Sequence, residues 1–162
     1  LPITNYQLPI TNYQLPITHT MPQVDFYILH TRKRQEKDRL VCQLTDKAWH
    51  QGYRIYIHTQ SQNIAKQLDI MLWTFKEESF LPHYIYPDVS SSAPIRIGYT
   101  SSVCDGMDVL INMTETVPLF FEGFKRIAEI VDDTPLAQNA GRTRYRFYRD
   151  RSYELKVHEI NR

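Results

Sequence analysis

Short runs of β-branched and aromatic residues alternate with amphipathic stretches through the first half of this sequence. Residues 24–29 form one such run and residues 54–58 form another, and each pattern predicts a buried strand. Between them, residues 36–51 place apolar side chains at helical spacing, and Gly52 follows where a helix commonly ends. Ser61 then precedes a second helical stripe. Strand, helix, strand and helix in this order predict βαβ units with a parallel sheet.

The second half of the sequence predicts more strands and a last helix. Three extended runs are separated by loop and turn residues: 83–86, 95–99 and 109–113. Residues 126–131 fit either a strand or a helix, and we favour a strand. A final helix is expected from about residue 135 to 150. The predicted fold is a three-layer α/β domain of Rossmann-like type with a mostly parallel sheet, formed by residues 21–162.

Composition excludes several classes of protein. A chain of 162 residues with 42% hydrophobic content allows one ordinary domain. No stretch approaches the ~20 consecutive apolar residues of a membrane-spanning helix. The formal charge of +1 is too balanced for a protein that coats nucleic acid with its whole surface. Cys42 and Cys104 have no ligand-like spacing, so we expect no disulfide framework, no zinc site and a cytoplasmic location.

The first twenty residues differ from the rest of the chain. They contain two perfect copies of the unit LPITNYQ and a third copy that decays after Thr18. The period of seven does not indicate a coiled coil, because each copy carries a proline, which costs roughly 3 kcal/mol inside a helix. We expect residues 1–20 to be a disordered tail and hypothesise that the functional protein begins at Met21.

No enzyme motif is present in the sequence. The turn after the first strand, residues 30–36, lacks glycine, and neither a dinucleotide-binding nor a P-loop glycine pattern occurs. The six histidines include no metal-binding pair at helical spacing, and Asp132-Asp133 is more typical of a strand end or turn than of a carboxylate dyad. We therefore predict no catalytic residue, no metal and no cofactor, and a nucleotide-using enzyme is the weaker alternative.

A basic segment near the end of the chain is the strongest functional signal. Residues 142–151 hold five arginines and one aspartate. In a helix, Arg142, Tyr145, Arg146 and Arg149 share one face. Guanidinium groups pair with carboxylates or phosphates, so this face suits an acidic peptide, especially a chain end, or single-stranded nucleic acid with bases stacked on the tyrosine. The alternative is a solvated basic face whose tyrosine packs against the sheet.

Four large apolar residues are crowded among charges just after the second predicted helix: Trp73, Phe75, Phe80 and Leu81. Such residues either fill the core beneath the sheet or form an exposed patch for a partner. Composition alone favours core packing.

Two motifs together resemble a known family. The helix end Leu68-Asp69-x-x-Leu72-Trp73 is followed by Glu78-Ser79-Phe80-Leu81-Pro82-His83, and the basic helix carries Arg142-x-x-Tyr145-Arg146-x-Tyr148-Arg149. This combination resembles the chi subunit of bacterial DNA polymerase III. The resemblance implies a non-catalytic accessory subunit with a Rossmann-like fold. It also implies two partners: the acidic C-terminal tail of single-stranded DNA-binding protein, and the psi subunit, which leads to the clamp loader.

The resemblance also assigns residues. It places tail binding on Arg142, Tyr145, Arg146 and Arg149, with Thr134 in the same pocket, and it places the psi contact on Trp73 and Phe80. DNA would then be contacted mainly indirectly, and no membrane would be involved. Residues 150–162 match the family poorly, and the repeat tail does not match it at all.

Overall fold

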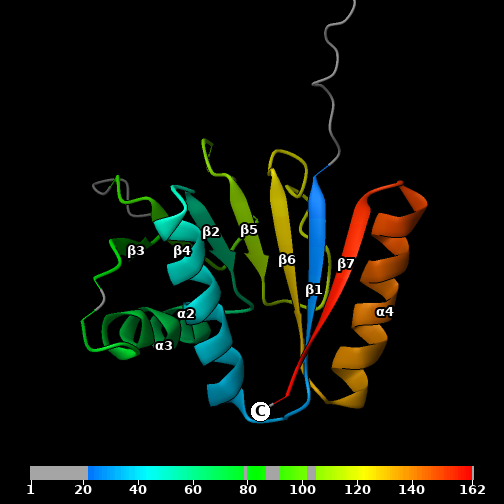
Figure 1. Ribbon diagram of the computed structural model, residues 1–162, viewed down its shortest axis with the longest axis horizontal. Helices are drawn as coiled ribbons and strands as arrows, with labels where there is room; N and C mark the ends of the chain where they lie inside the picture. The colour runs from blue at the N-terminus through cyan, green and yellow to red at the C-terminus, as the bar shows by residue number, and fades with distance from the viewer. Residues whose placement is uncertain (1–21, 79, 87–91, 102–104, 162) are drawn as a thin grey trace, which may run out of the picture.

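Parallel strands form the centre of the computed structural model, which describes residues 22–78, 80–86, 92–101 and 105–161 (Figure 1). The expectations for the tail, for Met21 and for Cys104 lie outside these ranges. The described strands are β1 (Gln23–Leu29), β2 (Ile55–His58), β3 (His83–Ile85), β4 (Ile95–Gly98), β5 (Val109–Asn112), β6 (Arg126–Val131) and β7 (Glu154–Ile160). Their order across the sheet is β3-β4-β2-β5-β6-β1-β7, and every pair is parallel.

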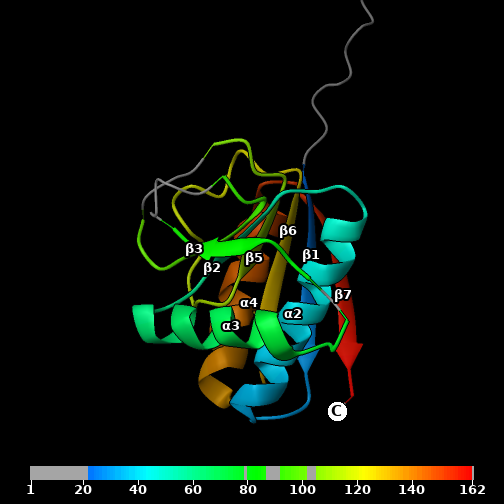
Figure 2. The ribbon, with the colours of Figure 1, turned by 90° about the vertical axis from the view of Figure 1, so that its left-hand side faces the viewer.

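Helices cover both faces of the sheet. Helices α2 (Arg34–His50) and α3 (Gln62–Thr74) lie on one face, and α4 (Pro135–Asp150) lies on the other (Figures 1 and 2). The predicted three-layer α/β architecture is therefore confirmed, and the sheet is parallel throughout the described residues.

Local signals place the helix ends. The Ser61 hydroxyl accepts a hydrogen bond from the Ile64 backbone N–H at 3.3 Å, and Thr134 does the same for Ala137 at 3.2 Å. Gly52 follows α2 with a φ of 89°, a left-handed conformation that glycine adopts without strain. The predictions of Ser61 as a cap and of Gly52 beyond the helix end are confirmed.

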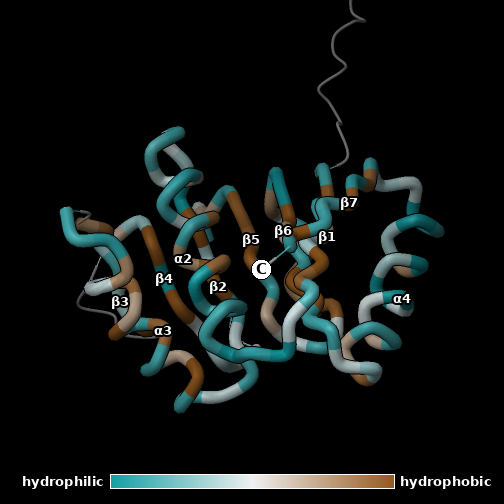
Figure 3. Tube along the Cα trace, turned by 60° about the horizontal axis from the view of Figure 1, so that its bottom comes forward, coloured by the Kyte–Doolittle hydropathy of each residue, from teal (hydrophilic) through white to brown (hydrophobic). Residues whose placement is uncertain are grey.

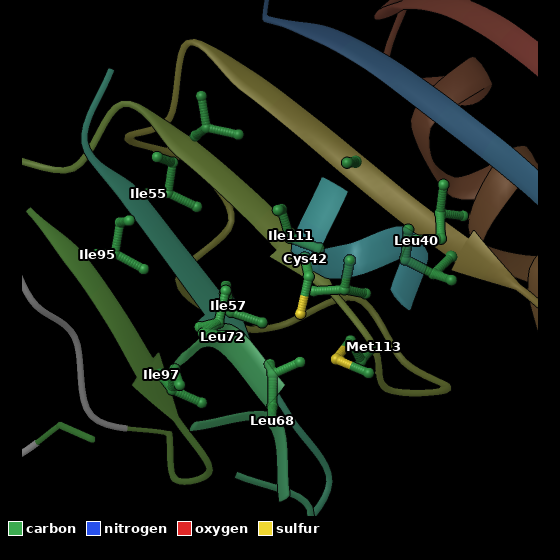
Figure 4. Close-up of a cluster of buried hydrophobic side chains, with 14 of the residues drawn as sticks. Leu40, Cys42, Ile55, Ile57, Leu68, Leu72, Ile95, Ile97, Ile111 and Met113 are labelled. Atoms are coloured by element: carbon green, nitrogen blue, oxygen red, sulfur yellow. The ribbon is translucent and has the colours of Figure 1, made fainter. Parts of the chain in front are cut away.

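Strand side chains alternate between two hydrophobic clusters. Ile55 and Ile57 face α2 and α3, as do Ile95 and Ile97, and Figure 4 shows Ile57 beside Leu72 and Ile97 near Leu68 of α3. Tyr56, between the isoleucines of β2, points to the opposite face, where Phe26, Leu110 and Ile127 pack under α4. Both faces of the central strands are therefore buried, as is usual for parallel sheets.

The sequence did not predict β7. Four of its seven residues are exposed, and Glu154, Lys156 and Glu159 interrupt its apolar positions. Its strand conformation depends on parallel pairing with β1, from Gln23 opposite Glu154 to Leu29 opposite Ile160. The two paired strands lie near opposite ends of the sequence, so no local pattern predicts their pairing. Residues 126–131 form the strand that we favoured.

The close approach of Gly98 to Tyr56 gives a test of core packing. A β-carbon at Gly98 would lie 1.8 Å from the Tyr56 hydroxyl oxygen, and the tyrosine is fully buried. Gly98→Ala should therefore lower the free energy of unfolding by about 2–3 kcal/mol, measured by urea denaturation. At Gly106, an added β-carbon meets nothing within 4 Å and only the φ of 79° is unfavourable, so Gly106→Ala should cost about 1 kcal/mol. Equal losses in the two variants would contradict the packing described here.

Candidate functional site

The basic segment forms the helix that the sequence predicted, and its residues separate into exposed and buried positions. Arg142, Arg146 and Arg149 are exposed on α4, and Tyr145 is half-buried. The Tyr145 ring packs against Phe26 of β1, with ring centroids 5.4 Å apart. The three arginines therefore share the predicted face, and the tyrosine packs against the sheet, as in the alternative of a solvated basic face.

A groove runs beside this face, between α4 and the sheet edge. We call it the α4 groove, of roughly 230 Å³; its lining residues are Phe26, Ile28, Val131, Gln138, Gly141, Arg142, Tyr145 and Val157. Its strand residues come from β1, β6 and β7 and are all apolar. The backbone of α4 comes close to β6 here, because a β-carbon at Gly141 would lie 3.0 Å from a Val131 methyl carbon. The result is an apolar groove with a guanidinium and a phenol at its side.

The three exposed guanidinium groups are only weakly engaged within the protein. Arg142 donates to the Asn139 side-chain oxygen at 2.9 Å, and Arg149 pairs with its exposed neighbour Asp150 at 3.3 Å. Arg146 makes no hydrogen bond or ion pair with any residue in the described ranges. Exposed pairs of this kind contribute about 0–1 kcal/mol, so an incoming carboxylate can compete with them.

Arg144 belongs to a different environment. It is 3% exposed, and its Nε donates to the Glu129 carboxylate at 2.7 Å. Glu129 is fully buried and also accepts hydrogen bonds from the Tyr148 hydroxyl at 2.8 Å and from the Asn112 amide at 3.0 Å. A second Arg144 nitrogen donates to the Glu115 carbonyl at 2.9 Å. One of the five arginines in the basic segment is therefore neutralised in the core.

Burial sets the protonation equilibria of this network. It raises the pKa of Glu129 above its usual range, although Arg144 and the hydrogen bonds from Tyr148 and Asn112 lower it. Burial, together with the Glu129 charge, also raises the pKa of the Tyr148 hydroxyl, which therefore remains a donor. The network fixes α4 on the sheet in one register.

Thr134 lies apart from the other predicted tail-binding residues. It caps the start of α4, where its hydroxyl donates to Asp132 at 2.8 Å. It lines a different hollow, shared with Arg34 and Lys37 of α2. The expectation that it lies in the same pocket as Arg142 and Tyr145 is wrong, because those residues lie further along α4, beside the α4 groove.

The aromatic cluster after α3 divides between surface and core. Trp73 is 48% exposed and Phe80 is 65% exposed, with ring centroids 5.5 Å apart, and Ile70 beside them is 64% exposed. Leu81 is fully buried and Phe75 packs against the core. Core packing, which composition favoured, is therefore wrong for Trp73 and Phe80 and correct for Leu81. Ile70, Trp73 and Phe80 together are called the α3 patch below.

Sequence reasoning missed the strand residues of the α4 groove. The sequence predicts Phe26, Ile28 and Val131 only as strand positions, and it predicts no strand at Val157. The signal available was the alternation along β1, which puts Phe26 and Ile28 on the face opposite Leu29. That α4 covers this face is a property of the tertiary structure.

The described residues give no indication of a metal site, a membrane-spanning helix or a reactive thiol at Cys42. Within the described ranges, no three His, Cys, Asp or Glu side chains are grouped so that they could hold a metal ion. No described helix combines the length and apolarity that crossing a membrane requires. Burial raises the pKa of the Cys42 thiol to about 12, so it is protonated at neutral pH and unreactive.

Comparison with protein families identifies close similarity over most of the chain. Residues 21–156 match the family model described as DNA polymerase III chi subunit, HolC. The DNA polymerase III subunit chi of Pseudomonas aeruginosa is 34% identical over 142 residues, which cover 88% of this chain and 99% of that protein. The corresponding subunit of Escherichia coli is 27% identical over 122 residues, covering 74% and 83%.

Solved structures share the fold at low sequence identity. The crystal structure of T4 UvsW superimposes with a TM-score of 0.64 at 9% identity, over 86% of this chain and 41% of that one. The C-terminal domain of the DEAD-box protein Dbp5 superimposes with a TM-score of 0.53 at 10% identity, over 84% and 90%. These likenesses concern the α/β fold alone.

Removing the arginine of the buried pair should destabilise the protein strongly. Arg144→Met leaves the Glu129 carboxylate buried without its partner, so the free energy of unfolding should fall by about 3–5 kcal/mol at pH 7 in urea denaturation. The exposed Arg142→Met is the matched control and should change it by less than about 0.5 kcal/mol.

The loss in Arg144→Met should also depend on pH. A carboxyl group whose pKa is raised by folding binds its proton more tightly in the folded state, so stability falls as pH rises above about 4. Without Arg144 the pKa of Glu129 should rise further, so the fall should extend to higher pH, and Glu129→Gln in the same chain should flatten it. A pH-independent loss would show that the pair is not what holds α4.

Proposed function

The chain belongs to the family of DNA polymerase III chi subunits, and on that premise we propose that it is a non-catalytic bridge in DNA replication. One surface binds the acidic C-terminal tail of single-stranded DNA-binding protein, and another binds the psi subunit and, through it, the clamp loader. A protein that holds both partners raises the effective concentration of each partner near the other, and this requires no chemical reaction in the bridging protein.

The α4 groove carries the first half of this proposal. An acidic peptide ending in an apolar residue presents carboxylates, including its α-carboxylate, next to one hydrophobic side chain. Exposed Arg142, Arg146 and Arg149 offer charge-assisted hydrogen bonds to the carboxylates. The apolar groove beside Tyr145 offers burial to the terminal side chain. Charge alone would not distinguish this peptide from nucleic acid, whereas the apolar groove favours the peptide.

The α3 patch supports the second half. Trp73 and Phe80 leave about half or more of their surface exposed, which is costly unless a partner covers it. Large aromatic side chains of this kind dominate the binding energy of protein interfaces. The patch and the α4 groove lie on opposite faces of the sheet, so both partners can bind at once (Figure 2).

Charge reversal on α4 tests tail binding. Arg146→Glu and Arg149→Glu should each weaken binding of a synthetic acidic tail peptide at least about tenfold in calorimetry, because an attractive pair becomes a repulsive one. Lys66→Glu, the same charge change on exposed α3, is the control and should leave the affinity unchanged. If reversal instead weakens only binding of bare single-stranded DNA with a steep salt dependence, α4 is a nucleic-acid surface and this proposal fails.

Truncation of the α3 patch tests the second surface. Trp73→Ala and Phe80→Ala should each prevent co-purification with psi and the clamp loader. Phe80→Ala should lower the free energy of unfolding by less than about 1 kcal/mol, whereas Trp73→Ala should lower it by about 1–3 kcal/mol, because the Trp73 ring is half covered and its centroid lies 4.4 Å from that of the His83 ring. Leu81→Ala, at the buried neighbour of Phe80, should cost about 2–5 kcal/mol. A complex that survives both aromatic truncations would remove psi binding from this patch.

A further inference from the structure

Two neighbouring hollows lie at the edge of the sheet where the parallel strands end, the edge that Figure 3 turns toward the viewer. The wider one, of about 380 Å³, follows the ends of β2, β4 and β5. The narrower one, of about 160 Å³, lies between the starts of α2 and α4. Gln60 and Thr114 line both, so the two hollows lie side by side. We call the pair the carboxyl-edge crevice.

Topology favours ligand binding at this position. Strands β2 and β5 are neighbours in the sheet. The chain after β2 continues to β3 and β4 on one side of this pair, and the chain after β5 continues to β6 on the other side. The two connections therefore separate above the pair and leave the strand ends uncovered. In open parallel sheets such a switch point is the usual place for a ligand.

The wider hollow suits an uncharged ring. Among the described residues that line it, none carries a formal charge at neutral pH, since burial lowers the pKa of His58 and keeps its imidazole neutral. The His58 and Phe120 rings meet edge to face, with centroids 5.1 Å apart. Gln60, Ser101 and Thr116 bring exposed amide and hydroxyl groups to the same space. Aromatic faces with neutral hydrogen-bonding groups are what a nucleobase and its sugar require.

The narrower hollow is lined by more cations than carboxylates. Arg34, Lys37 and Arg144 line it together with Asp132 and Glu115, and α2 begins there after Lys33 without a side-chain cap. Burial lowers the pKa of Lys37, and its ion pair with Asp132 is long, at 3.8 Å. Arg34 is tied to Asp38 at 3.2 Å but remains exposed. Because the Lys37 pair is long and Arg34 stays exposed, both cations can still approach a phosphate at this helix start.

We propose that the carboxyl-edge crevice binds a nucleoside phosphate, with base and sugar in the wider hollow and the phosphate beside Arg34 and Lys37. The glycine-rich turn that usually cradles phosphate is absent from residues 30–36, and side-chain cations take its place. The ligand is either a free mononucleotide or the phosphorylated end of a DNA strand. No residue of the α4 groove lines this crevice, so the proposal is independent of tail binding.

Calorimetry on the full chain tests the proposal with four probes: deoxyadenosine monophosphate, deoxyadenosine, inorganic phosphate, and a short oligothymidylate with or without a 5′-phosphate. The nucleotide should bind at least about tenfold more tightly than nucleoside or phosphate alone, because both hollows contribute. Arg34→Gln and Gln60→Ala, both at exposed positions, should each weaken nucleotide binding by about fivefold or more. Lys66→Gln, at an exposed position of α3, should leave it unchanged.

The probes also separate the two sources of ligand. A preference for the phosphorylated oligonucleotide over the free nucleotide would assign the crevice to strand ends, and the reverse preference would assign it to free nucleotides. The proposal is overturned if the nucleotide binds no more tightly than phosphate alone, or if Arg34→Gln and Gln60→Ala change nothing.

Discussion

The ion pair between Arg144 and Glu129 is the contact on which the arrangement of α4 depends. Both side chains are buried, and a buried charge without its partner is costly, so α4 can dock only where Arg144 and Tyr148 meet the Glu129 carboxylate. This register turns Arg142, Arg146 and Arg149 outward and sets Tyr145 against Phe26. One buried pair therefore stabilises the third layer of the fold and orients the proposed docking face.

The parallel sheet explains why the surfaces are separate. Its two faces are covered by different helices, so the α4 groove and the α3 patch lie apart and can serve different partners. Because every strand runs the same way, all strand ends and helix starts gather at one edge, where the carboxyl-edge crevice lies. Bridging and ligand binding therefore require no conformational coupling in this fold.

Much of the fold follows from local signals. Apolar patterns predicted six of the described strands together with α2 and α3, and the cap residues Ser61 and Gly52 fixed helix ends, because these features involve only neighbouring residues. Strand β7 escaped prediction because half-exposed residues with mixed charges have no clear alternation. The candidate site was predicted in part: the face of α4 was correct, Thr134 was misplaced, and the strand residues of the groove were missed.

By itself, the sequence determined the α/β class, the helical face that carries three arginines and a tyrosine, and the motifs shared with the chi family. Periodicity, capping and spacing are properties of neighbouring residues, so they are the same however the helices and strands pack together. Only the tertiary structure decided which arginine is buried and which aromatic residues are exposed. The reason is that Arg144 meets an acid 15 residues away in the sequence, whereas no layer of the described structure covers Trp73 and Phe80 completely.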